Sequence, residues 1–177
     1  MSLSLGALAT PGLTAENVAL VSGAFRRSIP VEEIDHLATT GEPVGLLKNL
    51  MEVSGQEPEE VSALLNKEIS LPLVLTSRLI NTRIGEAIIR RVARILYPIS
   101  TDDPSVSIPA IRAAVINGLH ENDGSLTAIG FLKAYPNHTL AINIPALTAV
   151  IEKAQSIAGL VNFFSDSPLD GLKESQP

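Results

Sequence analysis

Residues 71–96 read LPLVLTSRLINTRIGEAIIRRVARIL, and this stretch carries the strongest helical pattern in the chain. Its isoleucines and valines recur every three or four residues, which is the spacing of one buried face of an α-helix. The pattern is interrupted at residues 81–85, where Thr82 is suited to cap a new helix. The stretch therefore predicts two helices, the second of which ends at Tyr97 and Pro98.

Shorter helical patterns lie on both sides of this stretch. Acidic residues open several of them and glycine or proline closes them, as expected at helix ends. We expect Val44 and Leu64 on buried helix faces and Ser125 at a helix cap, and we interpret residues 99–109 as a surface loop. The predicted helices span residues 31–39, 43–53, 57–67, 108–120, 125–134 and 145–164.

Two segments have the character of strands. The run NVALVSGAFRRSI, residues 17–29, has β-prone halves on either side of Ser22 and Gly23, which predicts a hairpin. HTLAINI, residues 138–144, alternates polar and apolar residues, and we expect it to join that hairpin. The predicted fold is mainly α (α+β): about seven or eight short helices with a small antiparallel sheet.

Composition limits the classes of protein to consider. The chain has 177 residues, of which 45% are hydrophobic and 3% aromatic, and its net charge is -6. An acidic chain with few aromatic residues is unsuited to nucleic-acid binding. The absence of cysteine excludes disulfides and cysteine-ligated metals. No apolar run reaches the length of a transmembrane helix.

The chain divides into one domain and two terminal segments. Residues 16–164 form the predicted single helical domain. Residues 1–15 are small and apolar, which is typical either of the remnant of a signal peptide or of a loosely packed segment, although a basic start is lacking. Residues 165–177 are rich in Ser, Asp, Pro and Gly and are predicted to be a disordered tail.

Signatures of catalysis and of cofactor binding are absent from the sequence. It contains neither the G-x-S-x-G motif of serine hydrolases nor a glycine-rich phosphate loop. His36, His120 and His138 are far apart in sequence and show no metal-ligand spacing. We therefore expect no catalytic residue, no cofactor and no metal, and interpret the chain as a non-enzyme.

One local cluster of positive charge stands out in this acidic chain. Five arginines fall within seventeen residues that contain one acid, Glu86. The cluster is either a solvated helix face with internal ion pairs to Glu86, or a docking patch for an acidic protein surface or anionic lipid. A third reading has the arginines tie helices together through Glu86 or Asp35. The five are Arg78, Arg83, Arg90, Arg91 and Arg94.

The order of these segments resembles a family. Residues 22–42, 73–96, 108–136 and 138–144 are similar to the domain of unknown function that precedes an α/β-hydrolase domain in many cyanobacterial proteins, and the resemblance extends over about residues 16–157. It implies a signal peptide and hence the periplasm or another exported compartment, with the cytoplasm as the alternative. No catalytic residue of the hydrolase domain maps onto this chain.

The leading functional hypothesis is a non-enzymatic interaction or regulatory module that binds a protein partner, such as a hydrolase or an envelope component. An alternative is a carrier of an apolar or acyl ligand, because long aliphatic helix faces could enclose a cavity and arginines could hold a head group. A further alternative is a fragment of a hydrolase.

Overall fold

The computed structural model describes residues 14–154, and side chains as far as residue 150. The helices are α1 (Val31–Thr40), α2 (Gly45–Ser54), α3 (Pro58–Leu65), α4 (Leu73–Ile80), α5 (Arg83–Val92), α6 (Pro104–Glu121), α7 (Ala128–Lys133) and α8 (Ile144–Ala154). The strands are β1 (Asn17–Ser22), β2 (Phe25–Pro30), β3 (Ile69–Ser70), β4 (Leu96–Pro98), β5 (Ser125–Leu126) and β6 (Thr139–Asn143). Residues 1–13 of the predicted N-terminal segment, the end of the last predicted helix and the predicted tail lie outside the described residues, whereas Ala15 is buried in the core.

The central sheet has four strands in the order β2-β1-β6-β4. β1 and β2 form the predicted hairpin, and the predicted late strand joins it as β6. The sheet is mixed rather than antiparallel as expected, because β6 runs parallel to β1 and antiparallel to β4. The amides of Glu16 and Asn17 both donate to the carbonyl of His138, at 2.9 and 3.0 Å, which places the beginnings of β1 and β6 side by side.

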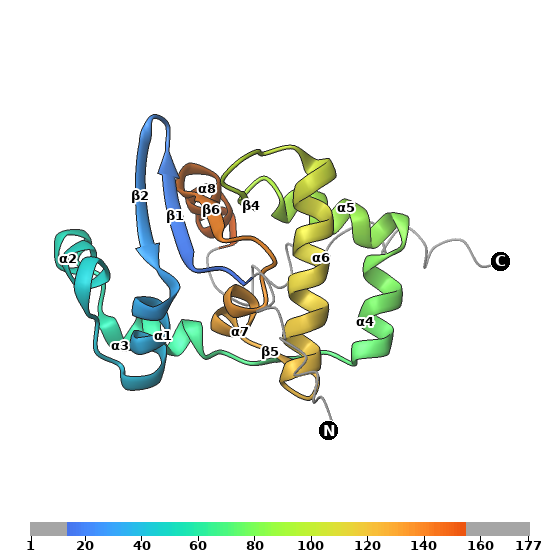
Figure 1. Cartoon of the computed structure of the whole chain (residues 1–177), viewed down its shortest axis with the longest axis horizontal. Helices are drawn as coiled ribbons and strands as arrows, with labels where there is room; N and C mark the ends of the chain where they lie inside the picture. The colour runs from blue at the N-terminus through green and yellow to red at the C-terminus, as the bar shows by residue number, and fades with distance from the viewer. Residues whose placement is uncertain (1–13, 155–177) are drawn as a thin grey trace, which may run out of the picture.

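The core lies between this sheet and helices α1, α6 and α7. Leu37 from α1, Leu119 from α6, Leu140 from β6 and Tyr135 after α7 are all completely buried. α6 packs on β4 and α7, and α4 and α5 pack on α6. Helices α2 and α3 pack on α1 (Figure 1). The predicted mainly α, α+β fold is confirmed.

Local signals placed several elements correctly. Helix α1 ends at Gly41, which has a φ of 77° and donates its amide to the carbonyl of Leu37 at 2.8 Å. Few side chains adopt that conformation as readily as glycine. The predicted break in residues 71–96 is also present, because α4 ends at Ile80 and Thr82 caps α5.

Two boundaries differ from the prediction. α5 ends at Val92 and not at Tyr97, because residues 96–98 pair with β6 as β4. α6 begins at Pro104 and includes Pro109, since Asp103 caps it by accepting the amide of Ser105 at 2.8 Å. Pro109 is the sixth residue of α6 and lies beyond the first turn, so it removes the backbone hydrogen bond to the carbonyl of Ser105.

The prediction that Ser125 caps a helix is wrong. Ser125 lies in β5, opposite Ser70 in the two-stranded sheet that β3 and β5 form. Thr127 caps α7 instead, and its hydroxyl accepts the amide of Gly130 at 3.0 Å. Both residues are suitable caps by type, so the pairing with a distant strand determined which one is used.

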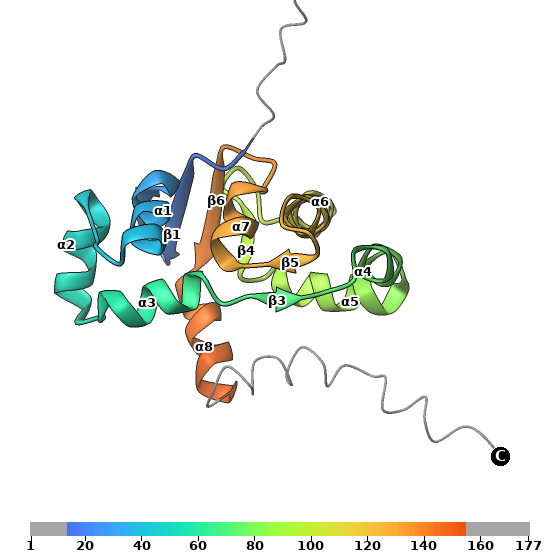
Figure 2. The same cartoon turned by 90° about the horizontal axis from the view of Figure 1, so that it is seen from below.

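The predicted burial of Val44 and Leu64 is also wrong, because these side chains are 36% and 49% exposed. Helices α2 and α3 lie at one end of the molecule and pack mainly on α1, so each buries a narrower face than its sequence pattern allows (Figure 2). Within the described residues, no helix combines the length and the hydropathy needed to cross a bilayer.

Candidate interaction face on helices α4 and α5

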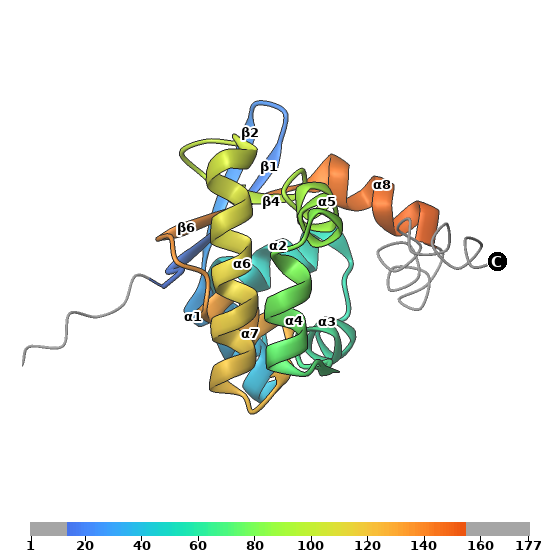
Figure 3. The same cartoon turned by 90° about the vertical axis from the view of Figure 1, so that its right-hand side faces the viewer.

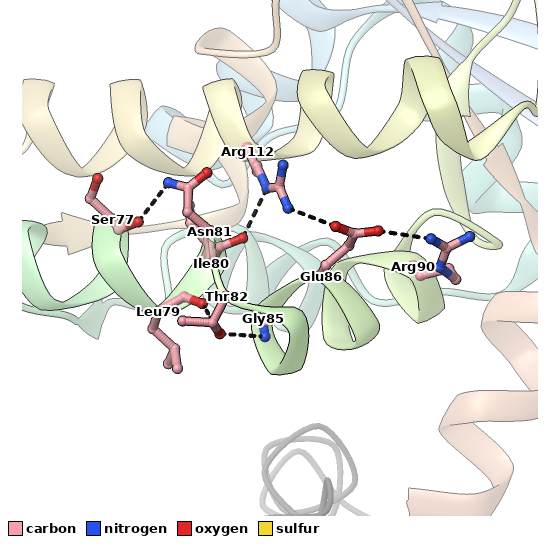
Figure 4. A network of polar contacts seen from close by, with 9 residues as sticks. All are labelled: Ser77, Leu79, Ile80, Asn81, Thr82, Gly85, Glu86, Arg90 and Arg112. Carbon is pink, nitrogen blue, oxygen red and sulfur yellow. Dashed lines mark hydrogen bonds and ion pairs between the residues drawn. The ribbon is translucent and has the colours of Figure 1, made fainter.

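A short polar turn holds α4 and α5 together as a helical hairpin. The side chain of Asn81 donates to the carbonyl of Ser77 at 2.7 Å, and the hydroxyl of Thr82 donates to the carbonyl of Leu79 at 2.7 Å. The same hydroxyl accepts the amide of Gly85 at 3.1 Å, as Figure 4 shows. These bonds satisfy free backbone groups at the end of α4 and the start of α5, so the angle between the helices is well defined.

Arg112 of α6 anchors this hairpin to the rest of the domain. Its Nε donates to the carbonyl of Ile80, the last residue of α4, at 2.9 Å, and its Nη2 lies 3.5 Å from a carboxylate oxygen of Glu86 (Figure 4). The other oxygen of Glu86 pairs with Arg90 at 2.8 Å. Sequence reasoning missed Arg112 because it lies outside the arginine cluster and its partners are about thirty residues away.

The five arginines of the predicted docking patch lie on α4, on α5 and in the turn after α5, and all are exposed. These elements lie together on one side of the molecule, where α4 and α5 lie beside α6 (Figure 3). Within the described part of the chain, only Arg90 has an ion-pair partner, and the expected pairing of Arg83 with Glu86 is absent. Asp35 pairs with Lys133 at 2.9 Å instead. Among the described residues, Arg90 alone of the five takes part in a contact that joins helices, because Glu86 pairs both with it and with Arg112 of α6.

The same hairpin exposes aliphatic side chains. Val74, Leu75 and Leu79 of α4 are 64%, 63% and 41% exposed. Leu73, Val74 and Leu75 follow one another, and so short a helix cannot bury three consecutive apolar residues on one face. Sequence reasoning did not single out these residues, although that run was the available signal. We name the exposed side chains of Val74, Leu75, Arg78, Leu79, Arg83, Ala87, Arg91 and Arg94 the α4–α5 face.

Charge is distributed unevenly along the molecule. Residues 73–94, which include α4 and α5, contain five arginines and one acid, whereas residues 31–68, which include α1 to α3, contain nine acids and two lysines. Figures 1 and 2 place α2 and α3 at the opposite end of the molecule from α4 and α5. An anionic partner is therefore attracted to one end and repelled from the other.

The comparisons with known proteins identify the family. A family model described as an alpha/beta hydrolase of unknown function (DUF1400) matches residues 14–143. This chain belongs to that family. The resemblance drawn from the sequence is thereby confirmed for the family as a whole. No curated protein and no solved structure matches the chain.

The name of this hydrolase family raises the question of a nucleophile. Ser70, His120 and Asp123 line a surface hollow of about 630 Å³ at the end of α6. All three residues are exposed, and among the described residues no hydrogen bond joins any two of them. Hydrolysis by a serine nucleophile needs the serine hydroxyl to be hydrogen-bonded to a histidine, which is itself hydrogen-bonded to a carboxylate. The sequence could not associate these three residues, because Ser70 is distant in sequence and comes close only through the pairing of β3 with β5.

The histidines do not form a metal site of this hydrolase-family domain. His36 contacts the carbonyl of Glu42 at 3.0 Å, and His138 lies 3.2 Å from the carboxylate of Glu16, so each is part of a separate surface contact. His120 lies in the hollow described above. Over residues 14–154, no three acidic or histidine side chains gather where they could hold a metal ion.

Proposed function

We propose that this chain is a non-enzymatic interaction or regulatory module, and that it docks a partner through the α4–α5 face. The observation that carries the proposal is the composition of that face. It combines arginines that have no ion-pair partner within the described residues with exposed aliphatic side chains, at the end of the molecule opposite α2 and α3. Arginine beside exposed apolar surface is typical of protein interaction sites.

The domain does not depend on this face for its own packing. The hairpin is held by Arg112, by the polar turn and by Ile80 and Ile89, which pack in the hydrophobic core, and none of these belongs to the α4–α5 face. Exposed charged groups contribute little to folding stability, typically about 0 to 1 kcal/mol for a surface ion pair. Residues that fold the protein and residues that bind a partner can therefore be changed separately.

The family description suggests the kind of partner. The family is described as a hydrolase family, so we propose that the partner is a separate hydrolase or an envelope component. The domain would cover or position that partner. Association between such surfaces gains rate and specificity from opposite charge, and it weakens as salt screens the attraction.

Co-purification tests the proposal. Tagged wild-type protein in native extract at low salt should bring down a specific partner, whereas Arg83→Gln/Arg91→Gln/Arg94→Gln should bring down at least about tenfold less. The matched control, Arg26→Gln/Lys48→Gln/Lys67→Gln, removes three positive charges from exposed positions elsewhere and should retain the partner. Equal recovery with both variants, or recovery of neither a specific protein nor membrane lipid with wild type, would contradict the proposal.

Enzymatic activity provides an independent test. A non-enzymatic module should give no turnover of a generic ester above background. Turnover that is lost in both Ser70→Ala and His120→Ala would show that the hollow at the end of α6 is a hydrolytic site. Retention of a lipid-sized mass in native mass spectrometry, after purification without detergent, would favour the alternative of a carrier.

A further inference from the structure

We propose that the partner of the α4–α5 face is an anionic lipid surface, to which the domain binds peripherally through that face. This inference rests on the proposed function, because it takes the α4–α5 face to be a docking surface. It adds the chemistry of the partner: acyl chains for the aliphatic side chains of α4 and phosphate head groups for the arginines of α5.

The aliphatic part of the face suits the boundary between head groups and acyl chains. Val74, Leu75 and Leu79 project from one short helix at the outer edge of the molecule, where α4 lies (Figure 1). None of the face is aromatic, whereas protein interfaces concentrate their binding energy in Trp and Tyr side chains set into complementary pockets. Acyl chains deform around projecting aliphatic groups and need no complementary pocket.

The basic part of the face forms a stripe along α5. Arg83, Ala87 and Arg91 recur at intervals of four residues, which aligns them on one side of the helix, and Arg94 follows in the turn after α5. The stripe contains no acid, because Glu86 turns toward Arg112 of α6. A cationic stripe beside an aliphatic one is the arrangement of segments that lie in the plane of a membrane interface.

The distribution of charge fixes how the domain meets a negative surface. Helices α2 and α3, which carry Glu52, Glu59 and Glu60, lie at the end away from the α4–α5 face, with the sheet and α6 between them (Figures 1 and 2). Charges further from the membrane than the Debye length, about 8 Å at physiological salt, are largely screened. The arginines therefore act on the membrane at close range, whereas the acids of α2 and α3 are largely screened.

Vesicle flotation with the full chain tests this inference. Vesicles of phosphatidylcholine with about 30 mol% phosphatidylglycerol supply the anionic surface, and vesicles of phosphatidylcholine alone are the reference. We expect the protein to float with the anionic vesicles at low salt, with at least about fivefold less bound to the reference vesicles or at high salt. Absence of flotation at low salt, or equal binding to both vesicles, would overturn the inference.

Two variants and one control separate the parts of the face. Leu75→Ser/Leu79→Ser and Arg83→Gln/Arg91→Gln/Arg94→Gln should each reduce the bound fraction by at least about fivefold. Val53→Ser/Leu64→Ser removes two exposed aliphatic side chains from the acidic end and should bind as wild type does. Circular dichroism melts of each variant establish that it folds, and equal losses in the control and the face variants would overturn the inference.

The outcome also distinguishes this inference from the proposed function. If a specific protein co-purifies and is lost with the arginine variant, but no flotation occurs, the α4–α5 face docks a protein and the lipid inference fails alone. If neither the co-purification nor the flotation responds to the arginine variant, both fail.

Discussion

Gly85 is the position at which a single methyl group should disturb the α4–α5 hairpin most. A Cβ atom built there would lie 2.5 Å from the Cα of Ile80 and 2.8 Å from the carbonyl carbon of Leu79, and closer still to the oxygen of Leu79. All three are backbone atoms, so the clash cannot be relieved by rotating a side chain. Gly85→Ala therefore forces the end of α4 away from the first turn of α5.

Two opposing effects set the size of the change. Alanine is favoured over glycine inside a helix by about 1 kcal/mol. Overpacking costs about 1 to 3 kcal/mol where side chains can adjust, and more where backbone must move. We expect Gly85→Ala to lower the free energy of unfolding by about 2 kcal/mol or more, which corresponds to a fall of about 4 to 8 °C in Tm for a domain of this size.

Urea denaturation followed by circular dichroism measures this change, and Gly118→Ala is the matched control. At Gly118 the added Cβ would lie 2.6 Å from a terminal methyl carbon of Leu126 and 3.5 Å from the carbonyl of Gly130. A terminal methyl can rotate away, so the control should change stability by less than about 1 kcal/mol. If Gly85→Ala proved as stable as wild type or more stable, the close packing of α4 on α5 would be refuted.

Three further substitutions test individual side chains. Tyr135→Phe should leave the urea midpoint unchanged or raise it, because this buried hydroxyl has no hydrogen-bond partner within the described residues and burial raises its pKa. Arg112→Met should lower the free energy of unfolding by about 1 to 3 kcal/mol in the same assay, since it leaves the carbonyl of Ile80 without its donor. The amide of Ser105 lowers the pKa of Asp103, so the contribution of this helix cap is present above the ordinary carboxyl pKa and is lost as pH falls through the lowered value. Asp103→Asn should therefore flatten the acid side of a plot of urea midpoint against pH.

Features that depend on neighbouring residues could be predicted from the sequence. Gly41 ends α1 because of its own backbone conformation, and Thr82 caps α5 through an amide three residues away. The arginine cluster was equally visible, because it is a matter of composition within one stretch. Such signals act within a turn or two of the chain, so the rest of the fold does not alter them.

Features that depend on distant partners could not be predicted. Ser125 and Thr127 are both good caps, and pairing of β5 with β3 determined which is used. The exposure of Leu75 and Leu79 depends on which side of α4 faces α6, and the role of Arg112 depends on the end of α4 lying beside it. The arginines of the candidate site could thus be predicted from the sequence. Its exposed aliphatic side chains, and the attachment of the hairpin to α6 through Arg112, could not.

The parallel pairing of β1 with β6 has a consequence for how the chain folds during synthesis. The side chains of Glu16 and His138 meet across a separation of 122 residues, where these two strands begin. The hairpin of β1 and β2 emerges first from the ribosome, yet one edge of β1 has no strand to pair with until β6 has been made. Contacts of such long separation form slowly, and unpaired strand edges favour aggregation. Completion of the sheet therefore waits for β6, and until then the open edge of β1 is a place at which the nascent chain can aggregate.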